Sequence, residues 1–159
     1  MSNILILTHP AFGILSVLAA VWLLVETMNA NGLNQARITK AAYGVTIFML
    51  LAWIFGGVWY VEYYPAEKAM ILNGPWAFAH SFYMEVKEHL FFIPLILALY
   101  LPVVVTRNRL HANRTARIMV VAICVNIIIL SLSIEVAGAV INQGSKVSFV
   151  QKDSLGDKQ

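Results

Sequence analysis

Four apolar runs divide this sequence, and each is long enough to cross the hydrocarbon of a bilayer as a helix, which takes about 20 residues. Because lipid offers backbone groups no hydrogen-bonding partner, such runs are expected to be helical. Of the 159 residues, 60% are hydrophobic and only 12% are charged, which is unusual for a soluble domain of this length. The runs lie at Pro10–Met28, Ala41–Tyr60, His80–Val105 and Ile118–Val140.

These runs predict an all-α, integral membrane four-helix bundle. We expect it to occupy residues 1–141 as one domain, followed by a polar C-terminal tail at residues 142–159. No Lys or Arg precedes the first run, so we expect a retained helix rather than a cleaved signal peptide. Thr8 is expected to cap that helix, with Pro10 in its first turn.

The basic residues predict the orientation of the bundle. The first connection holds Arg37 and Lys40, and the second holds only Lys68. The third connection is the most basic, with Arg107, Arg109, Arg114 and Arg117. The positive-inside rule therefore places the first and third connections in the cytoplasm and both termini on the non-cytoplasmic side. We expect the protein to lie in the inner membrane of a bacterium or archaeon, surrounded by lipid. The net charge of +3 is attributed to membrane orientation, so no nucleic-acid partner is expected.

The second connection combines apolar, aromatic and charged residues before the Asn73-Gly74-Pro75 turn signal. This pattern predicts a short interfacial helix, then a turn, then re-entry into the third run.

Ionisable residues gather near the non-cytoplasmic end of all four runs. Such residues are costly inside a membrane, so each indicates a candidate functional site. The set comprises His9, Glu62, His80, Glu85, Lys87, Glu88, His89 and Glu135.

The first hypothesis is a b-type haem. His80 and His89 are nine residues apart, about 13 Å along a helix, so they cannot be opposed axial ligands of one iron. His9 paired with either of them is the remaining combination, because neutral imidazole is a common axial ligand. Lys87 is expected to meet a propionate, and Gly13, Gly56 and Gly57 to leave room for the macrocycle. The function would then be electron transfer near the non-cytoplasmic face, with a quinol or other membrane-complex subunits as candidate partners.

A second hypothesis is a transition-metal site. Carboxylate and imidazole side chains hold metals in helix bundles. The candidate ligands are Glu62, Glu85, Glu88, His89 and Glu135.

Three further readings stay open. The same carboxylates beside Lys87 are suited to moving protons or other ions. Alternatively, Glu85–His89 and Glu88–Lys87 pairs form only an interfacial salt-bridge network. The third reading is a cofactor-free accessory subunit of a larger membrane complex. The sequence shows no nucleophile–base pair and no phosphate-binding glycine loop, so we do not expect an enzyme acting alone.

Overall fold

This computed structural model describes residues 2–156, with the side chains of residues 7–151 and 154. The described part is helical throughout, apart from turns and short connections. Its elements are α1 (Ser2–Met28), α2 (Gln35–Glu62), α3 (Tyr64–Leu72), the π-helix η1 (Ala79–Met84), α4 (Glu85–Leu90), α5 (Phe92–Arg107) and α6 (Arg114–Gly156).

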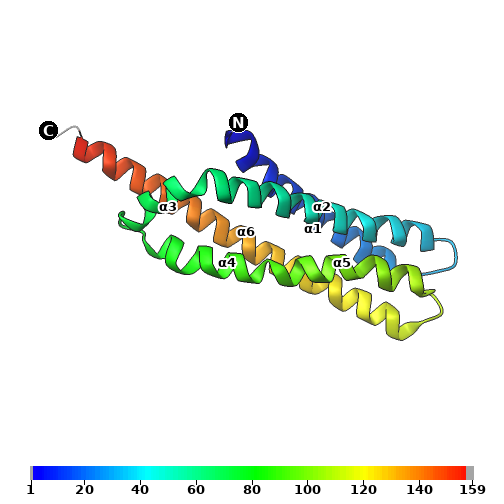
Figure 1. Cartoon of the computed structure of the whole chain (residues 1–159). Coiled ribbons are helices and arrows are strands. Elements are labelled where there is room, and N and C mark those ends of the chain that lie inside the picture. Colours follow the sequence, from blue (N-terminus) through cyan, green and yellow to red (C-terminus); the bar gives the residue numbers. More distant parts are fainter. Residues whose placement is uncertain (1, 157–159) are drawn as a thin grey trace.

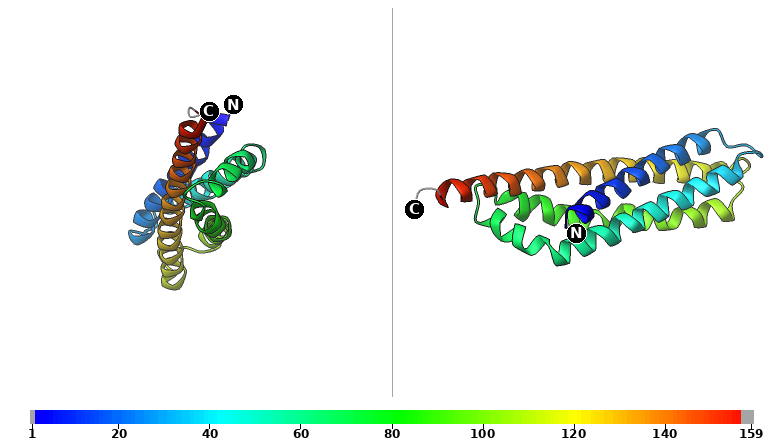
Figure 2. Two further views of the ribbon diagram at one scale, coloured as in Figure 1. Left: turned by 90° about the vertical axis from the view of Figure 1, so that its left-hand side faces the viewer. Right: turned by 90° about the horizontal axis from the view of Figure 1, so that it is seen from above.

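Four helical segments are long and apolar enough to cross a membrane. They are Leu7–Met28, Gln35–Glu62, Ala79–Arg107 and Arg114–Gln151. They lie side by side in an elongated bundle, in which α1 packs mainly on α2 and α6, and α5 packs on α2 and α6 (Figures 1 and 2). The prediction of an all-helical chain with four such helices is confirmed. The connections 29–34 and 108–113 meet at one end, here called the two-loop end, and α3 marks the other, here called the α3 end (Figure 1).

Two hydrophobic cores follow one another along the bundle. The larger core fills the half nearer the two-loop end, where Ala20, Ala42 and Ala98 are fully buried and let the helices approach closely. The smaller core lies at the α3 end around Tyr64 and Ile71. The polar residues described below therefore lie where one core gives way to the other.

Two prolines explain where the third long segment departs from a regular helix. Pro102 has no N–H to give to the Ala98 carbonyl, and the Thr46 hydroxyl of α2 donates to that carbonyl instead, at 2.6 Å. Pro94 similarly frees the Leu90 carbonyl, and α4 ends at Leu90. This break in the helix separates α4 from α5.

The expected helix and turn of the second connection are confirmed as α3, followed by a turn at Asn73. The expected start of the first helix is wrong. Because α1 begins at Ser2, Thr8 and Pro10 lie within the helix, and Thr8 is not an N-cap.

The segment expected to be a polar tail continues α6 without a break to Gly156. At 43 residues, α6 is about 65 Å long, whereas a bilayer with its headgroups is about 40–45 Å thick. Close packing holds this extension against the α3 end. A Cβ on Gly144 would lie 2.6 Å from the Ala79 Cβ, and one on Gly74 would overlap Ser148. The far end of α6 projects beyond the other helices (Figure 1).

Candidate functional site

Three ionisable side chains from three helices converge inside the bundle: His9 of α1, Lys87 of α4 and Glu135 of α6. Lys87 interacts electrostatically with both His9 and Glu135. Each of the three lies about 20 residues, or about 30 Å, from the end of its long helical segment at the two-loop end. We call this set the inner cluster.

Glycines on the facing helices provide the space that the inner cluster occupies. A Cβ on Gly56 of α2 would lie 2.5 Å from His9 Nδ1, and one on Gly13 of α1 would lie 2.8 Å from Glu135 Oε1. A Cβ on Gly138, one turn after Glu135, would lie 3.3 Å from Lys87 Nζ. Each polar side chain therefore packs against a position where a larger residue would displace it.

His9 is oriented by a backbone hydrogen bond. Its Nδ1 lies 2.8 Å from the Ala52 carbonyl oxygen, which can only accept, so Nδ1 carries the proton. The other ring nitrogen, Nε2, is then the basic one in the neutral ring. It is able to accept a proton or bind a metal.

Lys87 and Glu135 attract each other without direct contact. Among the described residues, neither a hydrogen bond nor an ion pair joins the two side chains. Charges in a poorly solvated interior interact strongly, so the protonation of one depends on the state of the other.

A second polar group, here called the outer group, lies toward the α3 end. The Tyr64 hydroxyl and His80 Nδ1 are 3.0 Å apart, and His80 Nε2 lies 4.0 Å from Glu85 Oε1. Tyr64 and His80 are buried, whereas Glu85 is exposed. Burial is the main cause that raises the pKa of the Tyr64 hydroxyl, so Tyr64 remains protonated. The outer group therefore runs from an exposed carboxylate to a buried phenol.

Glu88 extends the outer group. The Tyr60 hydroxyl lies within hydrogen-bonding reach of the Glu88 carboxylate. The other carboxylate oxygen, Oε1, is buried and has no hydrogen-bond partner among the described residues. A buried carboxylate oxygen without a partner is costly, so Glu88 Oε1 is an open acceptor position within the outer group.

The remaining predicted site residues lie elsewhere. Glu62, Glu85 and His89 are exposed, and His89 donates its Nδ1–H to the Glu85 backbone carbonyl at 2.7 Å. His89 follows Lys87 by two residues, so it points about 160° away from Lys87 around the helix. His9, which lies beside Lys87, is therefore on the opposite side of α4 from His89. The backbone brings neither the His9–His89 nor the His80–His89 pair together.

The predicted metal ligands are likewise dispersed. In the part of the chain that the structure describes, no three His, Cys, Asp or Glu side chains are grouped so as to hold a metal ion. The alternative surface pairs also differ from the structure, because His89 bonds a backbone carbonyl and Lys87 faces Glu135.

The half of the bundle between the inner cluster and the two-loop end is apolar. No Asp, Glu, Lys, Arg or His occurs between Gly13 and Val25, between Ala41 and Val61, from Leu90 to Thr106, or from Ile118 to Ile134. The Ser16 and Thr46 hydroxyls in this half donate to the Val45 and Ala98 carbonyls. Ionisable side chains therefore continue from the inner cluster toward the α3 end, where His80, Glu85 and Glu88 lie, and not through the apolar half.

The sequence pattern did not indicate Tyr60 and Tyr64 as members of the polar groups, because tyrosines at this level also form the aromatic belt of membrane helices. Tyr60 lies in the last turn of α2 and Tyr64 begins α3, and the turn between them brings the two rings together in a stack with centroids 5.3 Å apart. Gly138, one turn after Glu135, is an available signal, because it leaves room beside α6 for Lys87.

No family model, no curated protein and no solved structure matches this chain significantly. The chain is therefore characterised by its own structure, which combines four long apolar helices with ionisable residues that converge between them.

Proposed function

We propose that this chain is an integral membrane protein that takes up and releases protons at the inner cluster of His9, Lys87 and Glu135. The observation that best supports this proposal is that three titratable groups from three helices meet where glycines leave space for their side chains. Ionisable residues in apolar helices are costly and commonly mark proton or substrate sites. The proton exchange would serve a transport or redox reaction of a membrane complex.

In the proposed orientation, the two-loop end is cytoplasmic, and α3 and both termini are non-cytoplasmic. The arginines of the third connection support this orientation through the positive-inside rule. The apolar half of the bundle would then face the cytoplasm, so the inner cluster would exchange protons with the non-cytoplasmic side.

The chemistry rests on coupling between the three groups. A proton on Glu135 removes the charge that Lys87 faces, and a proton on His9 adds a cation beside Lys87. Adding a proton at one position therefore changes the affinity for a proton at the others. A bound partner that alters the spacing of α1, α4 and α6 would change these affinities and so release or take up protons.

Infrared titration of the protein in liposomes tests this proposal. We expect a carboxyl C=O stretching band that disappears as the pH rises and is absent in Glu135→Gln. The matched control is Glu85→Gln, the same change at an exposed carboxylate of the outer group. We also expect Lys87→Met to shift the titration midpoint of the band. If Glu135→Gln and wild type have identical titrations, the inner cluster does not exchange protons and the proposal is wrong.

A b-type haem is the second candidate, and one observation favours it. His9 donates Nδ1–H to a carbonyl, the arrangement usual for a metal-binding imidazole, and leaves Nε2 available. The partner would be His80 of η1, seven residues before Lys87, but its Nδ1 is engaged by Tyr64. Haem binding by both would require the Lys87 side chain to move aside, toward a propionate.

A visible spectrum of the purified protein, before and after reduction, tests the haem candidate. The sample is to be expressed with haem available. A Soret band that is lost in both His9→Ala and His80→Ala, and kept in His89→Ala, would establish this ligand pair. A colourless wild-type protein would exclude it.

A further inference from the structure

We propose that the outer group of Glu85, His80, Tyr64 and Glu88 is the path by which protons reach the inner cluster from the aqueous phase at the α3 end. This inference rests on the proton exchange proposed above and names the route for it.

The ends of the path fit the two environments that it would connect. Glu85 is exposed and lies 4.0 Å from His80 Nε2, so it is able to collect protons from water. Glu88 is adjacent to Lys87 in the sequence, and its Oε1 is buried without a partner among the described residues. The path therefore begins at solvent and ends at a buried carboxylate oxygen one residue along α4 from Lys87.

His80 is the central member because its two ring nitrogens face different neighbours. Nε2 is on the Glu85 side and Nδ1 is on the Tyr64 side, at 3.0 Å from the hydroxyl. The charged groups that act on His80 are Lys68 of α3 and Glu85 and Glu88 of α4. α6 meets this region through the uncharged Gly144 and Ile141.

The transfer balances without any other reactant. A proton from Glu85 or water binds His80 Nε2, and the imidazolium passes its Nδ1 proton to the Tyr64 oxygen. Tyr64 simultaneously releases its own hydroxyl proton toward Glu88, directly or through the neighbouring Tyr60 hydroxyl. Tyr64 ends as a neutral phenol, His80 as the other neutral tautomer, and Glu88 as a carboxylic acid. Return of His80 to its first tautomer prepares the path for the next proton.

The local fold supports a dedicated role for His80. It lies in a six-residue π-helix, η1, and π-turns are uncommon and often occur at functional sites. The extra residue in the turn alters the rotation of the helix between His80 and Lys87. His80 is thereby directed at Tyr64 of α3 while Lys87 points into the bundle.

The test is the rate at which the Glu135 carboxyl band responds to a rapid pH change in liposomes. We expect His80→Phe and Tyr64→Phe each to slow the response by about a hundredfold, the lower end of what a positioned proton-transfer group contributes. The final amplitude of the band is expected to be unchanged, because Glu135 is intact. The matched control is His89→Phe, which changes an exposed histidine of the same segment and is expected to keep the wild-type rate.

Chemical rescue separates proton transfer from packing. We expect imidazole in solution to restore the rate of His80→Gly and to have no effect on Tyr64→Phe. Tyr64→Phe keeps the aromatic ring that stacks on Tyr60, so it decides the question if the His80 variants fail to fold. Wild-type rates in Tyr64→Phe, or in folded His80→Phe, would overturn the entry path. A wild-type protein without a titrating Glu135 band would instead overturn the proposed function itself.

Discussion

At the scale of single residues, two neighbouring glycine positions of α2 differ in whether a larger side chain would fit. Gly56 and Gly57 are adjacent, yet a Cβ on Gly56 would lie 2.5 Å from His9 Nδ1, whereas one on Gly57 would meet nothing within 4 Å. Their sequence context is the same, so only the facing helix distinguishes them. This pair provides an internally controlled test of how tightly the inner cluster is packed.

We expect Gly56→Ala to destabilise the fold by about 1–3 kcal/mol, because overpacking forces His9 away from the Ala52 carbonyl. Gly57→Ala is expected to be neutral or to stabilise by up to about 1 kcal/mol, as alanine favours a helix over glycine. Thermal unfolding in detergent measures both. Equal effects of the two substitutions would contradict the packing of His9 against Gly56.

Lys87 and Glu135 are expected to be energetically coupled. Lys87→Met and Glu135→Gln each leave one polar group without its electrostatic partner, so each is expected to destabilise the protein. The double variant is expected to lose less than the sum of the two, with a coupling energy of about 0.5–3 kcal/mol. Denaturant unfolding of the four proteins measures the cycle, and strict additivity would show that the two charges do not interact.

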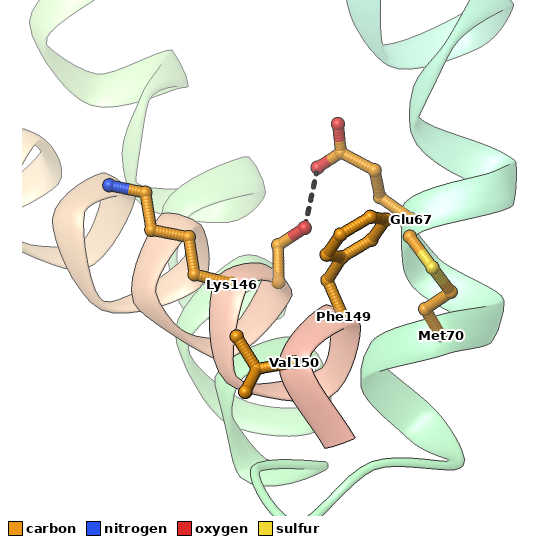
Figure 3. Close-up of a pocket in the computed structure, with 6 residues that line it drawn as sticks. Glu67, Met70, Lys146, Phe149 and Val150 are labelled. Atoms are coloured by element: carbon orange, nitrogen blue, oxygen red, sulfur yellow. Dashed lines mark hydrogen bonds between the residues drawn. The ribbon is translucent and has the colours of Figure 1, made fainter. Parts of the chain in front are cut away.

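At the scale of elements, the contact between α3 and the extension of α6 is expected to depend on pH. The Ser145 hydroxyl of α6 donates to Glu67 Oε2 of α3 at 3.4 Å, beside a shallow pocket (Figure 3). Met70 and Phe149 line this pocket, while Lys146 points away from Glu67 (Figure 3). Partial burial raises the pKa of Glu67 above its ordinary 4.5, and the Ser145 hydrogen bond offsets part of that rise.

The sign of the pH dependence follows from the raised pKa. The folded contact favours protonated Glu67, so its stabilising effect is full below pH 4.5 and is lost as the pH rises through the raised pKa. We expect Glu67→Gln to remove this component. The midpoint of thermal unfolding, measured by tryptophan fluorescence, is then expected to fall less as the pH rises. Glu62→Gln, at an exposed carboxylate, serves as the control and is expected to keep the wild-type profile. A Glu67→Gln profile that is superimposable on the wild type would rule out the buried carboxyl as the cause.

At the scale of the whole molecule, the bundle is polar at its two ends and at one intermediate level. The larger core separates the inner cluster from the two-loop end, whereas the outer group at the α3 end lies beside the smaller core, which includes Tyr64. Under the proposed function, the inner cluster would exchange protons with the α3 end and not with the two-loop end. The orientation in the membrane would then decide which compartment supplies the protons.

Cysteine labelling tests the proposed orientation. The native Cys124 is buried, so it contributes little background. We expect a membrane-impermeant maleimide to label Asn73→Cys in intact cells, and His111→Cys only after permeabilisation. Both positions are exposed, one at each end of the bundle. The reverse pattern would invert the orientation and place the entry path in the cytoplasm.

The sequence by itself determined the number and helical state of the four long segments, and the presence of α3. The physical reason is that these features depend on run length and composition, which lipid and backbone hydrogen bonding make decisive. A proline inside a helix leaves the carbonyl one turn earlier without its N–H partner, and at Pro102 the Thr46 hydroxyl donates to that carbonyl of Ala98.

Only the tertiary structure decided which polar residues meet. Helices that are apolar on nearly all faces carry no amphipathic period, so their sequence does not reveal their rotation about the axis. The π-turn before Glu85 changes that rotation again, and no residue pattern before it signalled the change. Consequently Lys87 faces Glu135 and His9, and His80 faces Tyr64, while Glu85 and His89, from the same short stretch, point outward.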